Sequence, residues 1–365
     1  MSTLFEIFHN IQQKIFPWLE GELDPLTEKE QQYIRVVSLL HLSNHIKEYR
    51  WRGVGRKRKE RASIAKAFVA KAIYNFETTE ILVEYLKGCK NLRRLCGWDT
   101  KQQIPSLATF SRAFSEFSHG QLPVKIHESL VKERCGAKVA GHVSRDATAI
   151  EVREKPAKKP PKAPSGQSKA KRGRPCKGAA RAAQEPKRLD MQPQRSLSEN
   201  LRDLPAHCDV GTKKNSKGYK ITWVGYKMHL DCIDGDIPVS AIITAASVHD
   251  SQVAIPLAQM TAERITNLYD LMDAAYDAPQ IKSYSAGLGH VAIIDHNPRG
   301  GEKILMDPAT KTRFAERSSA ERVNSNLKDN YGGRHIRVKG AQKVMAHLMF
   351  GVIALTATQL FRMLL

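Results

Sequence analysis

Cysteine is scarce in this chain of 365 residues, and its six cysteines are scattered. No two of them have Cys-x-x-Cys spacing and no histidine cluster accompanies them, which argues against a zinc finger. Dispersed thiols fit a reducing cytosol better than a disulfide framework. The first residues also lack a basic stretch followed by an apolar run. The sequence therefore predicts no signal peptide and a cytoplasmic protein.

Acidic residues are too few to balance the basic ones. There are 37 Asp and Glu against 58 Lys and Arg, a formal net charge of +21. Such an excess predicts a polyanionic partner, either nucleic acid or an anionic membrane. The only membrane candidate is the apolar tail, where His347, Gln359 and Arg362 interrupt the hydrophobic run. Residues 341–365 are therefore expected to form a buried helix that packs on the catalytic domain described below, with no membrane span.

Residues 1–135 have the apolar spacing of helices and are predicted to form an all-helical, DNA-binding region. One predicted helix follows Ser106, a plausible N-cap, and carries an apolar stripe. The stripe consists of Leu107, Phe110, Phe114 and Phe117. With a turn near Gly97, this helix fits either a helix-turn-helix or an ordinary amphipathic helix.

Residues 152–216 are predicted to be a basic, largely disordered insertion. Within 152–188 there are 13 Lys and Arg against 2 Glu, six prolines and no aromatic residue. Such a stretch cannot bury enough apolar surface to fold alone. It contains a Lys-Arg-Gly-Arg-Pro sequence similar to an AT-hook core, whose Arg172 and Arg174 would enter the minor groove of A·T tracts. The alternative is a solvated basic linker.

The remaining segments predict an α/β catalytic domain made of residues 139–151 and 217–340. Strands are expected at 140–150, 266–273 and 291–295, and a hairpin is expected over 221–244 with a turn at Gly235-Asp236. Helices are expected from about 249 to 264 and from about 311 to 330. This order describes a mixed sheet flanked by helices.

Three acidic residues lie at positions where a catalytic or metal-binding role is plausible. Asp146 is in the middle of an apolar strand, Asp273 ends a later strand, and Glu321 lies on the helix predicted over 311–330. On that helix, one face combines Glu321 with Phe314, Arg317, Asn324 and Lys328. Taken singly, the three acids could instead be caps or members of a solvated face.

These residues resemble those of the bacterial insertion-sequence DDE transposases that carry a Tyr-(2)-Arg-(3)-Glu-(6)-Lys signature. The spacing Arg317-(3)-Glu321-(6)-Lys328 matches, although Phe314 stands at the Tyr position. The blocks 144–148, 225–230, 246–251 and 271–277 are similar to the other blocks of the family. The resemblance covers roughly residues 90–365, apart from the basic insertion.

The resemblance implies an RNase H-like fold and a transposase that cleaves DNA at the ends of a mobile element and joins them to target DNA. Asp146, Asp273 and Glu321 would bind two Mg²⁺ ions, and Arg317 and Lys328 would contact double-stranded DNA. It also implies a homodimer in the active complex and a place at the bacterial nucleoid. Carboxylate oxygens suit a hard cation, and two ions can stabilise both the entering and the leaving oxygen of a phosphodiester.

Two questions remain open from the residues. A nuclease on the same scaffold, or a decayed transposase that only binds DNA, would share these features, and Phe314 is the best support for the second. Asp270 and Asp277 also compete with Asp273 for the second acidic position, because the register of a short strand is uncertain.

Overall fold

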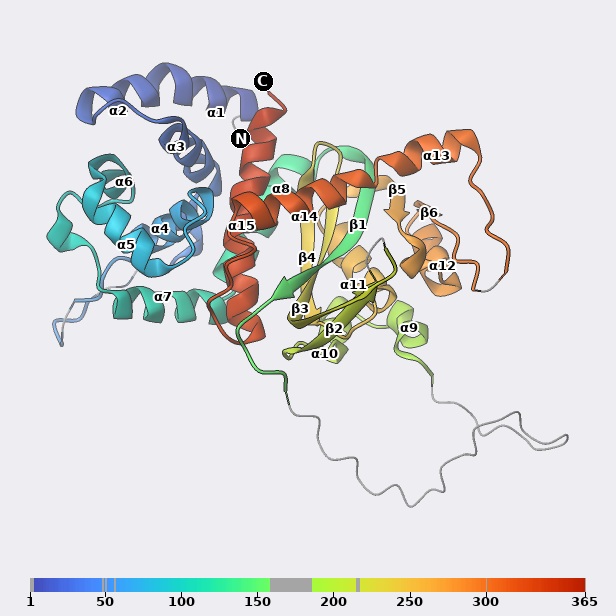
Figure 1. Cartoon of the computed structure of the whole chain (residues 1–365). Coiled ribbons are helices and arrows are strands. Elements are labelled where there is room, and N and C mark those ends of the chain that lie inside the picture. The colour runs from blue at the N-terminus through green and yellow to red at the C-terminus, as the bar shows by residue number, and fades with distance from the viewer. Residues whose placement is uncertain are drawn as a thin grey trace, which may run out of the picture.

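The computed structural model describes residues 3–47, 49, 51–55, 57–157, 186–214, 217–299 and 301–364. A helical region and a sheet region lie side by side, with the long helix α15 (Ala341–Arg362) between them (Figure 1). α15 contacts α3, α4, α7 and α8 on one side, and β4 and α14 on the other. The tail helix was predicted to pack on the catalytic domain, and in the structure it packs on both regions.

The N-terminal residues form a series of helices joined by turns and loops of different lengths. They are α1 (Leu4–Asn10), a π-helical turn (Ile11–Ile15), α2 (Phe16–Glu22), α3 (Glu28–Leu40), α4 (Arg61–Ile73), α5 (Thr79–Gly88), α6 (Lys90–Leu95), α7 (Leu107–His119) and α8 (Leu122–Cys135). Capping boxes at Thr3 and Thr27 satisfy the first backbone N–H groups of α1 and α3. The local sequence therefore determines where these two helices begin.

The apolar stripe of α7 packs into the core. Phe110, Phe114 and Phe117 are buried against Phe68 of α4, with ring centroids 5.0–6.3 Å apart, while Leu107 remains exposed. The helix-turn-helix interpretation is wrong. Eleven residues separate the end of α6 from the start of α7, and a helix-turn-helix needs a turn of about three or four. The ordinary amphipathic helix is the correct alternative.

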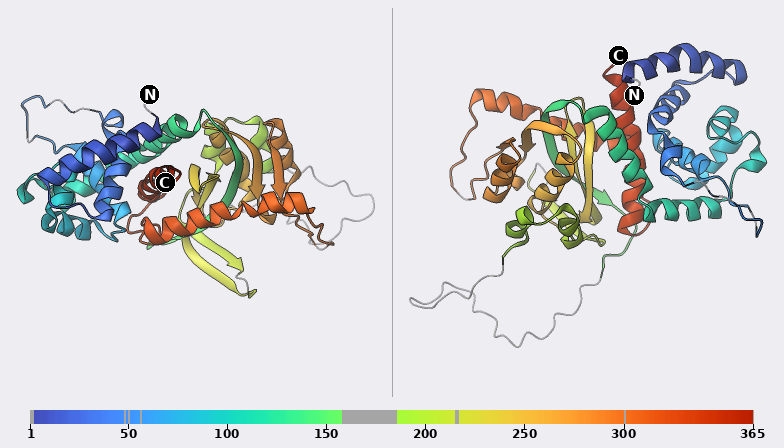
Figure 2. Two further views of the ribbon diagram at one scale, coloured as in Figure 1. Left: turned by 90° about the horizontal axis from the view of Figure 1, so that it is seen from above. Right: turned by 180° about the vertical axis from the view of Figure 1, so that it is seen from behind.

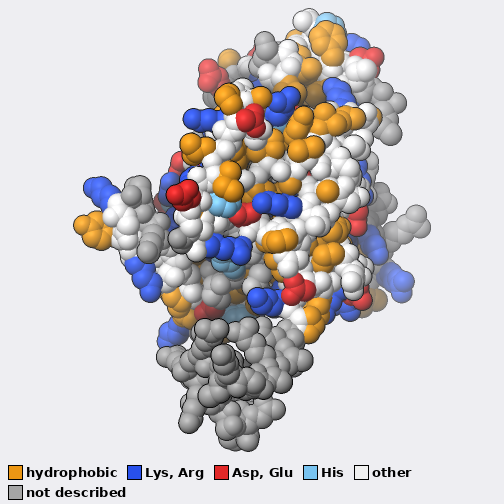
Figure 3. Space-filling view, turned by 90° about the vertical axis from the view of Figure 1, so that its right-hand side faces the viewer, with side chains coloured by type: hydrophobic (Ala, Val, Ile, Leu, Met, Phe, Trp, Pro, Cys, Tyr) orange, Lys and Arg blue, Asp and Glu red, His pale blue; other side chains and the backbone are white. Residues whose placement is uncertain are grey.

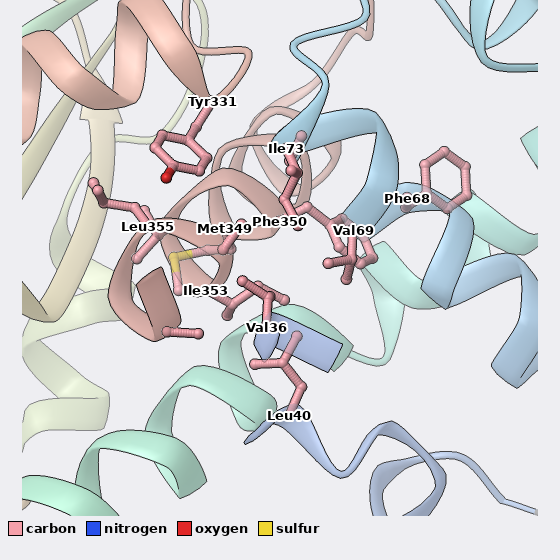
Figure 4. Close-up of a cluster of buried hydrophobic side chains, with 14 of the residues drawn as sticks. Val36, Leu40, Phe68, Val69, Ile73, Tyr331, Met349, Phe350, Ile353 and Leu355 are labelled. Carbon is pink, nitrogen blue, oxygen red and sulfur yellow. The ribbon is translucent and has the colours of Figure 1, made fainter. Parts of the chain in front are cut away.

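The two regions share one hydrophobic core around the middle of α15. Figure 4 shows Val36 and Leu40 of α3 and Phe68, Val69 and Ile73 of α4 facing Met349, Phe350 and Ile353 of α15. α15 is long and apolar enough to span a membrane by length and composition, but 83% of its most apolar stretch is buried inside the protein. Its hydrophobicity is that of a core helix.

The sheet region contains six strands. They are β1 (Val139–Glu151), β2 (Asp209–Lys214), β3 (Lys220–Ile233), β4 (Ile237–Ala245), β5 (Thr266–Met272) and β6 (Val291–Ile294). Their order is β2-β3-β1-β5-β6, and β4 also pairs with β3. β1 is antiparallel to β3 and parallel to β5. The predicted mixed sheet is thus confirmed, as is the turn between β3 and β4, where Gly235 and Asp236 both have positive φ.

Helices cover both faces of the sheet. α11 (Ser251–Ala262) packs on β3 and β4, and α12 (Pro279–Gly287) packs on β6 and α11. On the other face, α14 (Ser318–Asn330) crosses β1 and β3 (Figure 1). The ends of β1 and β5 therefore lie between helices from the two layers.

The prediction of disorder across 152–216 is wrong for its second part. Residues 186–214 contain α9 (Arg188–Met191), a 3₁₀ turn (Gln192–Gln194), α10 (Leu197–Asp203) and β2. α9 and α10 pack on α11, where Asn200 is buried and its side chain donates to the Gln259 side chain. The composition of this part did not indicate that it folds, because the side chains that attach it to α11 are polar. The AT-hook-like residues Arg172 and Arg174 lie outside the described residues.

The single helix predicted over 311–330 is also wrong. The chain forms α13 (Pro308–Ala315) and α14, with a tight turn at Glu316 and Arg317. The Glu316 carbonyl accepts from the Ser319 amide and from the Ser144 hydroxyl of β1. That carbonyl therefore does not take part in a continuous helical ladder, and the start of α14 is attached to the sheet.

Candidate active site

Asp146 lies at the centre of β1, on the face that α14 covers. Its strand partner on β3 is Leu230. The Asn324 side-chain amide donates a hydrogen bond of 2.9 Å to Asp146 Oδ2. Since Asn324 lies on α14, this bond connects the helix that carries Glu321 directly to the strand that carries Asp146.

The opposite face of β1 is held by a buried ion pair. Arg145 and Asp231 are direct cross-strand partners, and the guanidinium donates two bonds of 2.7 Å to the carboxylate. Thr261 of α11 also donates to Asp231. Burial opposes the charge of Arg145, but the paired carboxylate outweighs burial and raises its pKa. The pair fixes the register of β1 against β3 and hence the position of Asp146.

Asp273 directly follows β5, and the structure distinguishes it from its two rivals. The last parallel pair of β1 and β5 joins Arg145 to Met272, so Asp273 lies one residue further along, beside Asp146. The Asp270 carboxylate is buried and accepts from Ser285, His290 and Asn267. Asp277 pairs with Lys282 at 2.6 Å. Both rivals are therefore engaged elsewhere.

Burial dominates the electrostatics of the two aspartates. Burial raises the pKa of Asp146 to about 6, and repulsion from Asp273 adds to this effect. Hydrogen bonds from the Ala147 amide and Asn324, together with the charge of Arg317, act in the opposite direction. Burial likewise raises the pKa of Asp273. Two carboxylates held together in this way form a site that favours a cation.

Asp250 is a third acid near this site, close enough for its charge to act on Asp273. Asp250 immediately precedes α11 but makes no side-chain capping bond. Its carboxylate instead pairs with Lys227 of β3 at 2.9 Å, and its charge contributes to raising the pKa of Asp273. The signal that could have revealed it is the pair of charged residues, Lys227 and Asp250, in otherwise apolar segments.

Glu321 is connected to the two aspartates through Arg317. It is on the first turn of α14, its side chain is 54% exposed, and its carboxylate pairs with Arg317. The charge of Arg317 also lowers the pKa values of Asp146 and Asp273, so this guanidinium lies between the acids. The guanidinium carbon of Arg317 is 5.7 Å from the ring centroid of Phe314, a cation–π contact that needs no Tyr hydroxyl.

Lys328 is more distant from the two aspartates than Arg317 or Asn324. It lies in the last turn of α14, about 10 Å along the helix axis from Glu321 at ~1.5 Å per residue. The face predicted for one helix is thus divided: Phe314 belongs to α13, Arg317 precedes α14, and Glu321, Asn324 and Lys328 follow on α14.

The donor set can hold a divalent metal ion, although the predicted triad is not gathered. Among the described residues, no three His, Cys, Asp or Glu side chains are close enough together to form a metal site. Asp146 and Asp273 nevertheless provide adjacent, half-buried oxygen donors whose ionisation is disfavoured unless a cation is present. Oxygen-only ligands of this kind suit Mg²⁺ or Mn²⁺.

Comparison with known protein families agrees with this geometry. A profile described as a transposase DDE domain matches residues 195–357, and one described as a transposase domain (DUF772) matches residues 22–116. The chain belongs to the insertion-sequence DDE transposases. No curated protein and no solved structure matches it.

The family membership makes this protein a DNA transposase with an RNase H-like domain, which cleaves and transfers DNA strands with the help of metal ions. The match to the DDE domain covers Asp273, Glu321 and the whole of α14. It begins at residue 195 and therefore does not include Asp146. The position of Asp146 in the transposase therefore rests on the β1–β5 register and on the bond from Asn324.

Proposed function

We propose that this transposase holds two Mg²⁺ ions with Asp146, Asp273 and Glu321 and uses them on the phosphodiester at the end of its mobile element. The observation that carries the proposal is the adjacency of Asp146 and Asp273, two half-buried carboxylates with raised pKa values next to Arg317. When bound, such ions would activate the attacking oxygen and stabilise the leaving one.

Three further side chains would orient Asp146, neutralise the phosphate and complete the ligand set. Asn324 orients Asp146 through its 2.9 Å hydrogen bond. Arg317 lies beside all three acids and is placed to neutralise a phosphate that enters the site. Glu321 completes the ligand set from α14, and its pairing with Arg317 keeps its carboxylate at the border of the site.

The test is strand cleavage and strand transfer on a duplex that carries the element's own end. Wild-type protein should nick and join this DNA with Mg²⁺, and Glu321→Gln should bind the DNA but not cut it. Calorimetric titration with Mn²⁺ should also show binding to the wild type and loss of binding in Asp146→Asn. Cleavage by Glu321→Gln at the wild-type rate would refute the assignment.

The helical region is proposed to bind the element's ends. A hollow of about 600 Å³ lies between the segment before α4 and the first turn of α7. Its described lining contains five cations, Lys57, Arg58, Lys59, Arg61 and Arg112, and no acid. Glu116 pairs with Arg58 and Arg61. The other three are exposed and available to phosphates, so replacing them with Gln should weaken end binding.

The active complex is proposed to be a homodimer that works at the nucleoid. A mobile element has two ends, and each must be cut, so two sites of this kind are needed at once. The AT-hook-like residues Arg172 and Arg174 remain predicted contacts to the minor groove. Replacing both with Gln should reduce binding to A·T-rich duplex more than to G·C-rich duplex.

A further inference from the structure

The β2–β3 hairpin is an arm that stands away from the protein. β2 pairs with the first six residues of β3, from Lys214↔Lys220 to Asp209↔Gly225. Figure 2 shows this hairpin projecting beyond the body, on the same side as α14. Tyr219 is 69% exposed and Ile221 42% exposed near its tip. A two-stranded hairpin gains little stability alone, so its projection serves something other than the core.

The arm is strongly basic. Residues 209–225 contain four Lys and one Asp. Asp209 lies at the base of the arm, where it is buried and accepts from the Ser247 hydroxyl. Lys213 and Lys220 are exposed, and their positions in the register place them on opposite faces of the arm. Figure 3 shows Lys and Arg side chains along this projection at the left edge of the molecule.

Lys213, near the tip of the arm, lies close enough to the end of α14 to interact with Lys328. Burial lowers the pKa of Lys328, and repulsion from Lys213 and Arg334 lowers it further. Glu151 and Asp329 are the acids that oppose this effect, and Asp329 is already paired with Arg334 at 2.6 Å. Lys213 of β2, Lys328 of α14 and Arg334 of the following loop thus lie in one region, where the nearby acids do not neutralise all three charges.

α14 links this basic region to the candidate active site. Glu321, Asn324 and Lys328 follow one another along the helix, so the basic region begins about 10 Å from Glu321. Phosphates along one strand of a duplex are spaced about 3.4 Å apart along the helix axis. A duplex with its scissile phosphate at Asp146 and Asp273, beside Asn324, would therefore reach Lys328, about 6 Å further along α14, within about two base pairs, and the arm beyond it.

We infer that the arm, through Lys213 on one face and Lys220 on the other, lies in a groove of the duplex being cut and binds its phosphate backbone together with Lys328 and Arg334, without reading its sequence. The inference rests on the proposed function, because it places the scissile phosphate at the two aspartates. A second protein copy is the competing occupant, but four lysines per arm would repel an identical arm.

The test is the salt dependence of binding by the full-length protein to its end duplex. The triple variant Lys213→Gln, Lys220→Gln, Arg334→Gln keeps Lys328 and the acids. Each lost phosphate contact should lower the slope of log K against log salt by about 0.9. The loss of affinity between 50 and 200 mM salt should thus be roughly 40-fold smaller in the variant than in the wild type. Its preference for the end over a scrambled duplex should not change.

Two control variants make this result specific. Lys125→Gln, Lys132→Gln, Lys282→Gln removes three exposed cations from α8 and α12 and should keep the wild-type slope. Replacing Lys213 and Lys220 with Arg and Arg334 with Lys should also keep it, because the charges remain. A wild-type slope in the Gln variant, or an equal fall in the α8 and α12 control, would overturn the inference.

The outcome can be separated from that of the proposed function. If the Gln variant keeps its slope but wild-type protein cleaves the end, only the role of the arm is lost. If the slope falls but neither protein cleaves with Mg²⁺, the proposed catalytic assignment is lost and the DNA-binding arm remains. If the variant changes only the sedimentation mass of DNA-free protein, the arm is a protein interface and the inference is wrong.

Discussion

Asp146→Asn should make the metal-free transposase more stable at neutral pH. Burial and Asp273 raise the pKa of Asp146 from an ordinary value of 3.8 to about 6. Below pH 3.8 the group is protonated in both the folded and the unfolded state, so it has no effect. Above pH 6 it is ionised in both, and the folded state bears the full cost. At 1.36 kcal/mol per pKa unit, this cost is about 3 kcal/mol.

Asparagine removes this cost because it carries no charge, and its side-chain oxygen can still accept from Asn324. Urea unfolding in EDTA should therefore show little difference between the variant and the wild type at pH 4, and an advantage for the variant approaching about 3 kcal/mol at pH 7.5. Saturating Mg²⁺ should reverse the difference, since an ion at about 1,000 times its Kd stabilises the wild type by about 4.1 kcal/mol.

Asp277→Asn is the matched control. Burial opposes the ionisation of Asp277, but its pairing with Lys282 prevails and lowers its pKa. This group therefore stabilises the fold above its unfolded pKa and loses that effect as the pH falls, so its replacement should destabilise the protein at pH 7.5. If Asp146→Asn also destabilised the metal-free protein at pH 7.5, the account of two repelling, half-buried aspartates would be refuted.

Three further substitutions test the framework around the site, each by urea unfolding. Arg145→Met should cost about 3–5 kcal/mol, because it leaves Asp231 buried without its partner; a cost below 1 kcal/mol would contradict this. Lys227→Ala should cost about 1–3 kcal/mol by leaving Asp250 unpaired beside Asp273, and restoration by Lys227→Arg is expected. Gly225→Ala should cost about 2 kcal/mol or more, since φ is +150° and the added Cβ would lie 2.1 Å from a backbone oxygen; a neutral result would disprove this strain.

The hydrophobic pattern was sufficient to predict much of the fold. The strand around Asp146, the hairpin with Gly235-Asp236 and the buried tail helix follow from period-2 alternation, turn residues and apolar runs, which are local signals. The break before α14 was not predictable in this way, because it depends on the Ser144 hydroxyl, 172 residues distant from Glu316.

In the candidate site, too, local sequence signals identified some residues, while residues that depend on distant partners were missed. Asp146 and Asp273 could be selected from their places in apolar strands, and the Arg317–Glu321 pair from its spacing. Arg145–Asp231 and Lys227–Asp250 were missed because each pair joins separate elements, and the partners are brought together only by the tertiary fold. Residues 186–214 were missed because the side chains that attach them to α11 are polar, so no apolar pattern marks α9 and α10.

The central place of α15 has a consequence for how the protein is made. The helix nearest the end of the chain fills the space between the first helices and the sheet, and Phe361 meets Phe8 with ring centroids 5.9 Å apart. The first helices therefore cannot acquire their buried partner until α15 has left the ribosome, long after they have been made themselves. A nonsense mutation that removes only this last segment should yield an insoluble product rather than a shortened, DNA-binding one.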